Sequence, residues 1–134
     1  MIDVESLIFD EISRAVEEAF PTVFMTGEYV RVPPSFPCVS LIEMDNATYR
    51  NTQTNQSQEN HAAILYELNV YSNRQTGKKA ECRAIVGFVD RLLQDRNFTR
   101  MMLEPIPNQD DATIYRMIGR YRAVASADNQ LYRR

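Results

Sequence analysis

The spacing of apolar residues changes along this chain, and that change limits the folds open to it more than any motif does. In residues 3–19 apolar side chains recur every three or four positions, which predicts an amphipathic helix. Asp3 is placed to cap the first turn of this helix. Phe20 and Pro21 end it, because the residue before a proline is driven out of the helical conformation.

A second stripe with helical spacing predicts a helix over residues 78–94, with Thr76 as its cap. The apolar side of this helix is expected to face the core. Arg83, Asp90 and Arg91 fall outside the stripe, so we expect them to face solvent.

The rest of the regular structure is predicted to be β-strand. Five segments show alternation or β-prone composition: residues 22–26, 38–44, 61–72, 100–106 and 112–126. Three prolines make residues 28–37 an irregular connection or a sheet edge. The resulting order, α-β-β-β-α-β-β, has strand pairs joined by short turns. It predicts an α+β fold, a two-layer sandwich in which two helices cover one face of a mainly antiparallel sheet.

Residues 45–60 contain almost nothing that a core could bury, and six of the last ten positions are Asn or Gln. This composition predicts a flexible polar loop or arm, enclosed by an antiparallel hairpin of residues 38–44 and 61–72. In an isolated chain it favours a solvated hairpin tip. With a partner it favours an arm that becomes ordered on binding. Residues 127–134 are predicted to be a loose tail.

Composition predicts one globular domain over residues 1–134, because 44% of the residues are hydrophobic and 25% are charged. The longest apolar stretch, residues 84–89, is far shorter than the ~18 residues that a membrane span needs. The acidic start of the chain differs from the basic start of a secretory signal. We therefore expect synthesis in the cytoplasm and no membrane partner.

Groups that could bind a metal are few. The single histidine, His61, cannot build a histidine metal site. Cys38 and Cys82 lie far apart in the sequence, and we expect them to be free buried thiols. No metal site is therefore predicted.

Catalytic motifs are also absent from the sequence. There is no glycine-rich phosphate loop and no G-x-S-x-G turn. Asp110 and Asp111, with Glu104, could form an acid pair or bind a cation, but adjacent acids at a turn are more typical of a solvated turn. We expect no enzymatic activity and no cofactor.

Charge is distributed unevenly, although the net charge is only −3. Residues 1–20 hold six acidic residues and one arginine, a net of −5. Residues 112–134 hold five arginines and one aspartate, a net of +4. Ends of opposite sign can attract each other within one chain or between copies, or each can be a solvated surface.

The last predicted strand places arginine and isoleucine on one face and Tyr115 and Tyr121 on the other. The first set is Ile114, Arg116, Ile118, Arg120 and Arg122. Mixed rows of this kind suit protein interfaces, where arginine is enriched, so a subunit interface is our preferred interpretation over a solvated surface. A nucleic-acid surface is disfavoured because the stacking aromatics lie on the opposite face.

Several features together resemble one known family. They are the length, the order of elements, the run NVYSN at residues 69–73 with the helix after it, and the run PNQDDATIYRMIGRYRA at residues 107–123. The chain resembles the small tail-terminator or tail-completion proteins of long-tailed bacteriophages, also described as tail-to-head joining or minor capsid proteins. The resemblance extends from the first helix to about Ala125.

The resemblance implies a structural protein of the virion tail that assembles as a ring, commonly a hexamer, on the end of the tail tube. The partners implied are further copies of the chain, the tail tube protein and the head-tail connector protein. Asp10 and Glu17 would pair with the arginine row across subunits. The polar loop would be the docking arm. Its residues are Asn46, Tyr49, Arg50, Asn51, Gln53, Asn55 and Gln58.

Two alternatives stay open. The first is a head-completion or connector protein of the same phage. The second is a small nucleic-acid-binding regulatory domain that uses the same arginines. The acidic net charge gives no reason to expect nucleic acid, and a steep salt dependence of binding would support it.

Overall fold

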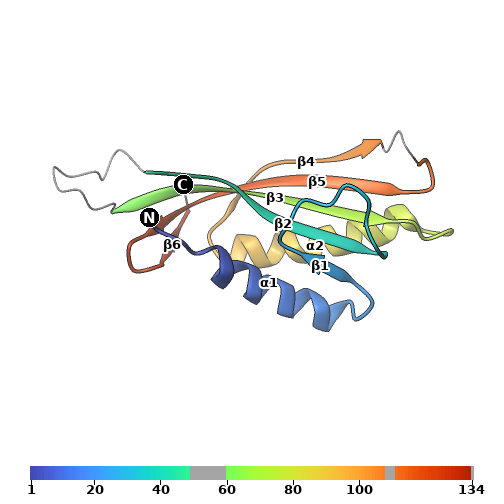
Figure 1. Ribbon diagram of the computed structural model, residues 1–134, viewed down its shortest axis with the longest axis horizontal. Helices are drawn as coiled ribbons and strands as arrows, with labels where there is room; N and C mark the ends of the chain where they lie inside the picture. Colours follow the sequence, from blue (N-terminus) through green and yellow to red (C-terminus); the bar gives the residue numbers. More distant parts are fainter. Residues whose placement is uncertain (49–59, 108–110, 134) are drawn as a thin grey trace.

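Both helices lie on the same face of one sheet, as Figure 1 shows, so the chain has the predicted two-layer α+β architecture. The computed structural model describes residues 1–48, 60–107 and 111–133. The elements are α1 (Glu5–Ala19), β1 (Phe24–Thr26), β2 (Cys38–Thr48), β3 (His61–Ser72), α2 (Lys78–Asp95), β4 (Thr99–Pro107), β5 (Tyr115–Ser126) and β6 (Leu131–Tyr132).

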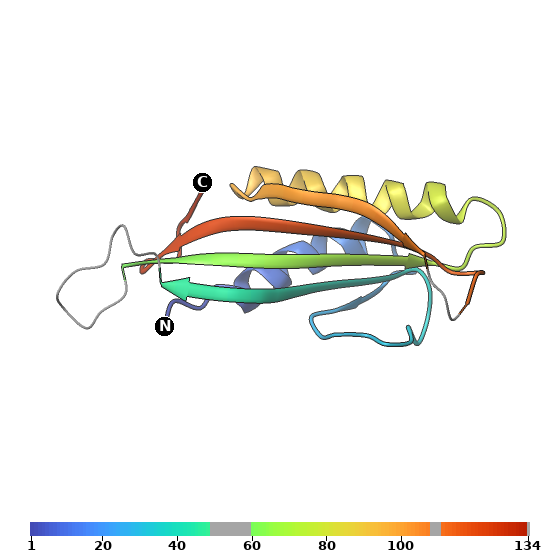
Figure 2. The ribbon, with the colours of Figure 1, turned by 90° about the horizontal axis from the view of Figure 1, so that it is seen from above.

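The strands are arranged in the order β1-β2-β3-β5-β4, and β6 pairs with the end of β5 that β4 leaves free. β1 runs parallel to β2, and the other pairs are antiparallel. Figure 2 shows the long strands β2, β3 and β5 side by side above α1. The predicted order of elements is confirmed through β5, and one short strand follows it.

That short strand corrects the prediction of a loose tail over residues 127–134. β6 pairs with β5, and Leu131 packs against the core. Asn97 Nδ2 donates a hydrogen bond to Leu131 O (3.0 Å), and Arg133 donates one to Gln94 O (2.8 Å). The tail is thus held in both directions: Asn97, just after α2, donates to the tail, and Arg133 of the tail donates to one of the carbonyl oxygens that the C-terminal end of α2 leaves without a helical partner.

β2 is longer than predicted, which corrects the start of the polar loop. The strand continues from Met44 through Thr48, with a bulge between Glu43 and Asp45. A bulge inserts one residue and so breaks the alternation on which the prediction depended. Asn46 therefore lies in the strand, where its Nδ2 donates a hydrogen bond to Ile2 O (2.7 Å).

The starts of the two helices differ from the predicted caps. Val4 holds the N-cap position of α1, although Asp3 Oδ1 does accept a hydrogen bond from the Glu5 backbone N–H (3.1 Å). At α2 the cap is Gly77 and not Thr76. Gly77 has φ of +82°, a conformation that glycine adopts without steric cost.

Asp90 of α2 turns towards the sheet, so the prediction that it faces solvent was wrong. Its Oδ1 accepts hydrogen bonds from Tyr121 Oη (2.7 Å) and Arg100 Nη1 (3.1 Å). Tyr121 is fully buried, and its hydroxyl needs this partner. The bond identifies the face of β5 that carries Tyr121 as the face covered by α2.

The core lies between the sheet and the helices. Alternate residues of β3, including Tyr66 and Leu68, are buried there with Ile12 of α1 and Ile85 of α2. Phe98, which follows α2, is fully buried, and its ring meets the edge of Tyr66 at 5.3 Å between centroids. This contact closes the end of the core beyond α2.

β4 forms one edge of the sheet. It carries Pro105 and Pro107, and its register with β5 shifts between Arg100 and Met102. Prolines and bulges are typical of edge strands, because an edge needs no complete row of donors.

Candidate functional site

The face of the sheet that the helices leave uncovered carries the predicted arginine row. Arg116, Arg120 and Arg122 alternate along β5 with Tyr121, which faces α2. Ile114 precedes the first residue of β5, so within the strand the row begins at Arg116, two residues later than predicted. The local sequence explains this, because the Ile114 N–H is held in a turn by the Asp111 carbonyl (3.2 Å).

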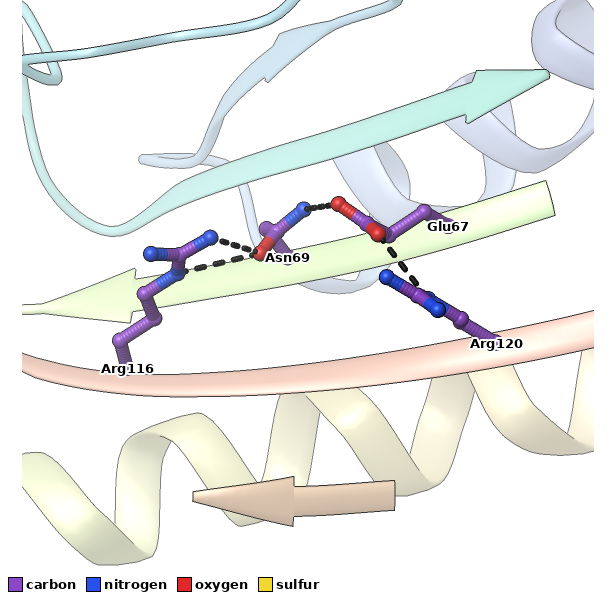
Figure 3. Close-up of polar contacts among 4 residues, drawn as sticks. All are labelled: Glu67, Asn69, Arg116 and Arg120. Carbon is purple, nitrogen blue, oxygen red and sulfur yellow. Dashed lines mark hydrogen bonds and ion pairs between the residues drawn. The ribbon is translucent and has the colours of Figure 1, made fainter. Parts of the chain in front are cut away.

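Two arginines of the row are tied to β3 by a polar network, drawn in Figure 3. Arg116 Nη2 and Nε donate to Asn69 Oδ1 (2.7 and 3.1 Å), and Asn69 Nδ2 donates to Glu67 Oε1 (3.0 Å). Arg120 Nε donates to Glu67 Oε2 (3.2 Å). Glu67 lies directly opposite Arg120 in the ladder, the position at which opposite charges attract best across strands. We call the surface of Glu67, Asn69, Arg116, Arg120 and Arg122 the arginine face.

Much of the arginine face is already buried within one chain. Glu67 is 7% exposed, Asn69 1% and Ile118 6%. The Arg116 guanidinium lies 5.2 Å from the centroid of the Tyr71 ring. Ile118, which the sequence analysis assigned to a subunit interface, is thus almost wholly covered within one chain and leaves little surface for a partner.

Arg122 differs from its two neighbours. It lies opposite Leu65 of β3 and Thr99 of β4, neither of which can neutralise a guanidinium. Among the described residues it forms no ion pair. Three carboxylates lie on the same side of the sheet as the three arginines: Glu67 of β3, Glu104 of β4, opposite Ile118, and Asp45 of β2, opposite Leu65. Among the described residues only Glu67 forms an ion pair with one of these arginines, so the guanidinium of Arg122 stays available. Such a surface can bind a carboxylate partner through bidentate hydrogen bonds.

Glu67 and Asn69 are the members of this site that the sequence analysis missed. Both interrupt an otherwise apolar strand on the side away from Tyr66 and Leu68. Polar residues at alternate positions of a buried strand were the available signal, because a buried polar side chain requires a partner.

The predicted acidic partners, Asp10 and Glu17, are both exposed on α1, in the other layer of the domain. The structure therefore does not bring them to the arginine face of the same chain. Contact between these charges within one chain is prevented by the sheet itself.

A groove of about 540 Å³ runs between α1 and β1. Phe9 and Met25, both half-buried, supply its apolar lining, and four carboxylates surround it. They are Asp3, Glu5, Asp10 and Glu28. We call this feature the acidic groove; none of the described residues that line it is basic.

Glu43 of β2 extends the negative charge behind this groove. Burial raises the pKa of its carboxyl, and the charges of Glu5 and Asp3 raise that pKa further. Tyr66 lies directly opposite Glu43 in the ladder. Within the described part of the chain, neither Glu43 Oε1 nor the Tyr66 hydroxyl has a partner at hydrogen-bonding geometry, although both atoms are buried.

We predict that Glu43→Gln raises the stability of the fold at about pH 7 more than at about pH 4. The pKa of the Glu43 carboxyl is higher in the folded protein than in the unfolded one, so the neutral carboxyl favours the folded state at low pH. This contribution to the stability of the fold is lost as pH rises through the folded-state pKa. Glutamine stays neutral and avoids that loss. Urea unfolding at both pH values measures the difference, with Glu17→Gln on the exposed side of α1 as control; a loss of stability at pH 7 would contradict the prediction.

Most of the predicted docking arm lies outside the described residues. Tyr49, Arg50, Asn51, Gln53, Asn55 and Gln58 belong to this group. Asn46 lies in β2, as described above. The role of the arm stays a prediction.

The groups considered for chemistry have ordinary structural surroundings. Burial raises the pKa of the Cys38 thiol to about 11 and that of Cys82 to about 12, so both are protonated at neutral pH. Asp111 Oδ1 accepts hydrogen bonds from the Thr113 N–H (2.9 Å) and hydroxyl (2.6 Å), which lower the pKa of its carboxyl. Within residues 1–48, 60–107 and 111–133, no three His, Cys, Asp or Glu side chains are grouped to hold a metal.

No helix in the described ranges is long and apolar enough to cross a membrane. No protein-family model matches the chain, and no curated protein is significantly similar to it.

Proposed function

We propose that this chain is a structural protein of a long-tailed bacteriophage. It acts by assembly and not by catalysis: copies join into a ring that ends the tail tube and meets the head connector. The proposal combines the family resemblance of the sequence with the arrangement of charge on the domain. Its site in the virion would be the tail.

One observation carries the proposal furthest, namely that the two charged surfaces lie on opposite layers of the domain. The arginine face is on the side of the sheet opposite the helices, whereas Asp10 and Glu17 lie on α1. Because one chain cannot bring these surfaces together, their attraction acts between copies. An interface made of two different patches is heterologous, and it closes into a ring when its rotation permits.

Arg122 is the sharpest probe of this surface, because its guanidinium has no ion pair among the described residues. Arg116 and Arg120, in contrast, already serve the fold. A change at Arg122 therefore tests assembly with little effect on folding.

Arg122→Glu is expected to reduce the fraction of tail tubes capped by the protein at least about tenfold, the usual effect of losing a central interface arginine. Negative-stain microscopy of purified protein mixed with tail tubes of the same phage measures it. Arg91→Glu, the same change on the exposed side of α2, is the control and should cap as the unmodified chain does.

Bare tube ends with the unmodified protein at saturation would contradict the terminator function. The head-side connector role would then be tested on isolated heads. Retention on nucleic acid that falls steeply with salt would instead favour the regulatory domain.

A further inference from the structure

We infer that the acidic groove between α1 and β1 is the binding site for the arginine face of a second copy, so that every copy uses both surfaces. This inference rests on the self-assembly proposed above, and it names the partner of the arginine face. The groove, β1 and Glu28 were not among the residues that the sequence analysis assigned to an interface.

The carboxylates of the acidic groove have no counter-charge within the part of their own chain that the structure describes. Among the described residues none of Asp3, Glu5, Asp10 and Glu28 forms an ion pair. Glu11, on the same helix, is instead paired with Arg96. The groove thus holds carboxylates whose charge is available to another molecule. Within the described ranges Glu17 and Glu18, further along α1, also form no ion pair, but only the groove carboxylates lie beside Phe9 and Met25.

The lining of the groove is partly apolar, so a partner must match apolar surface as well as negative charge. Phe9 and Met25 line it between the carboxylates. A suitable partner therefore presents guanidinium groups beside an apolar side chain, since Arg stems and thioethers pack on aromatic rings while the guanidinium binds carboxylates.

The arginine face presents this combination. Met102 of β4 lies directly opposite Arg120 in the ladder, so its half-buried thioether is on the same side of the sheet. The Arg120 side chain is 46% exposed, and Arg122 has no ion pair in the described ranges. Two guanidiniums and one thioether thus match the carboxylates and the apolar lining of the groove.

The groove and the arginine face lie far apart in the fold, so a contact between them joins two copies and has a direction. The groove lies beside β1, at one end of the strand order, while the arginine face is centred on β5, with β2 and β3 between them. Because the two patches differ, each copy offers one to the copy before it and the other to the copy after it.

The test mixes two variants, each of which keeps only one surface. The groove variant, Asp10→Lys with Glu28→Lys, retains the arginine face, and the face variant, Arg122→Glu, retains the groove. We expect neither variant to associate with itself at about 1 mM. We expect the amide signals of residues 120–122 of isotope-labelled groove variant to shift when unlabelled face variant is added.

A matched control makes the same change of charge elsewhere on the helices. Glu18→Lys with Asp95→Lys alters two exposed residues that do not line the groove. This control is expected to associate with itself as the unmodified chain does.

Absence of any shift at residues 120–122 in the mixture would overturn the inference, as would self-association of the groove variant through the same signals. Capping of tail tubes by the unmodified chain is scored separately. Tubes capped without these shifts would leave the proposed function standing and the groove contact refuted. Shifts without capping would refute the terminator function and leave the contact between copies.

Discussion

Phe98→Ala is expected to lower the free energy of unfolding by about 3–5 kcal/mol, as fully buried Phe-to-Ala changes do. Phe98 has no exposed surface, and its ring closes the core against Tyr66. Removing the ring leaves a cavity whose walls cannot collapse, because they belong to the sheet and to α2. A domain of this size has only about 5–15 kcal/mol of stability, so the variant keeps little reserve.

Urea unfolding measures the effect, as a fall in the midpoint with an unchanged slope. Phe20→Ala is the matched control, because Phe20 is half-buried and meets Phe88 edge to face at 5.6 Å between centroids. Its loss is expected to be clearly smaller. Equal losses at the two positions would show that Phe98 does not close the core.

Arg116→Glu combined with Arg120→Glu is expected to destabilise the fold by about 2–4 kcal/mol, somewhat below the ~3–5 kcal/mol that removal of one partner costs in a buried ion pair. Glu67, 7% exposed, would lose its counter-ion and face two further carboxylates. Asn69 would lose the donors that satisfy its carbonyl oxygen. The partial exposure of Arg120 places the effect below that of a wholly buried pair.

Arg122→Glu supplies the comparison on the same face, because Arg122 has no ion pair among the described residues. Its effect on unfolding is expected within about 0.5 kcal/mol, as for ordinary surface changes. Comparing the unfolding curves of the double variant and of Arg122→Glu distinguishes arginines that stabilise the fold from an arginine that serves only an interface. A double variant as stable as the unmodified chain would show that the network contributes nothing to the fold.

The sequence was sufficient to predict elements whose pattern is local. The helical spacing of residues 3–19 and the alternation of β3 and β5 each depend on neighbours within a few positions. The pattern failed where one residue broke the period, as at the bulge in β2. It also failed at β6, whose two residues are held mainly by contacts with β5 and the end of α2.

The polar contacts of the arginine face could not be predicted from the sequence, for a different reason. Glu67 and Arg120 are 53 positions apart, and Asn69 and Arg116 are 47 apart. Only the register of β3 against β5 brings them together, and a shift of one residue would send every side chain to the other face. For the same reason the pattern placed Asp90 in solvent, although Tyr121 draws it towards the sheet.

The edge strand β4 has a consequence for the protein at high concentration. Pro105 and Pro107 have no N–H to donate, so the backbone of another chain cannot complete a ladder along that part of the edge. Amyloid-type growth, which needs an unbroken row of backbone donors and acceptors, is blocked there. Association on this side of the molecule is thereby left to side chains, which differ between proteins, and not to the backbone, which is common to all of them.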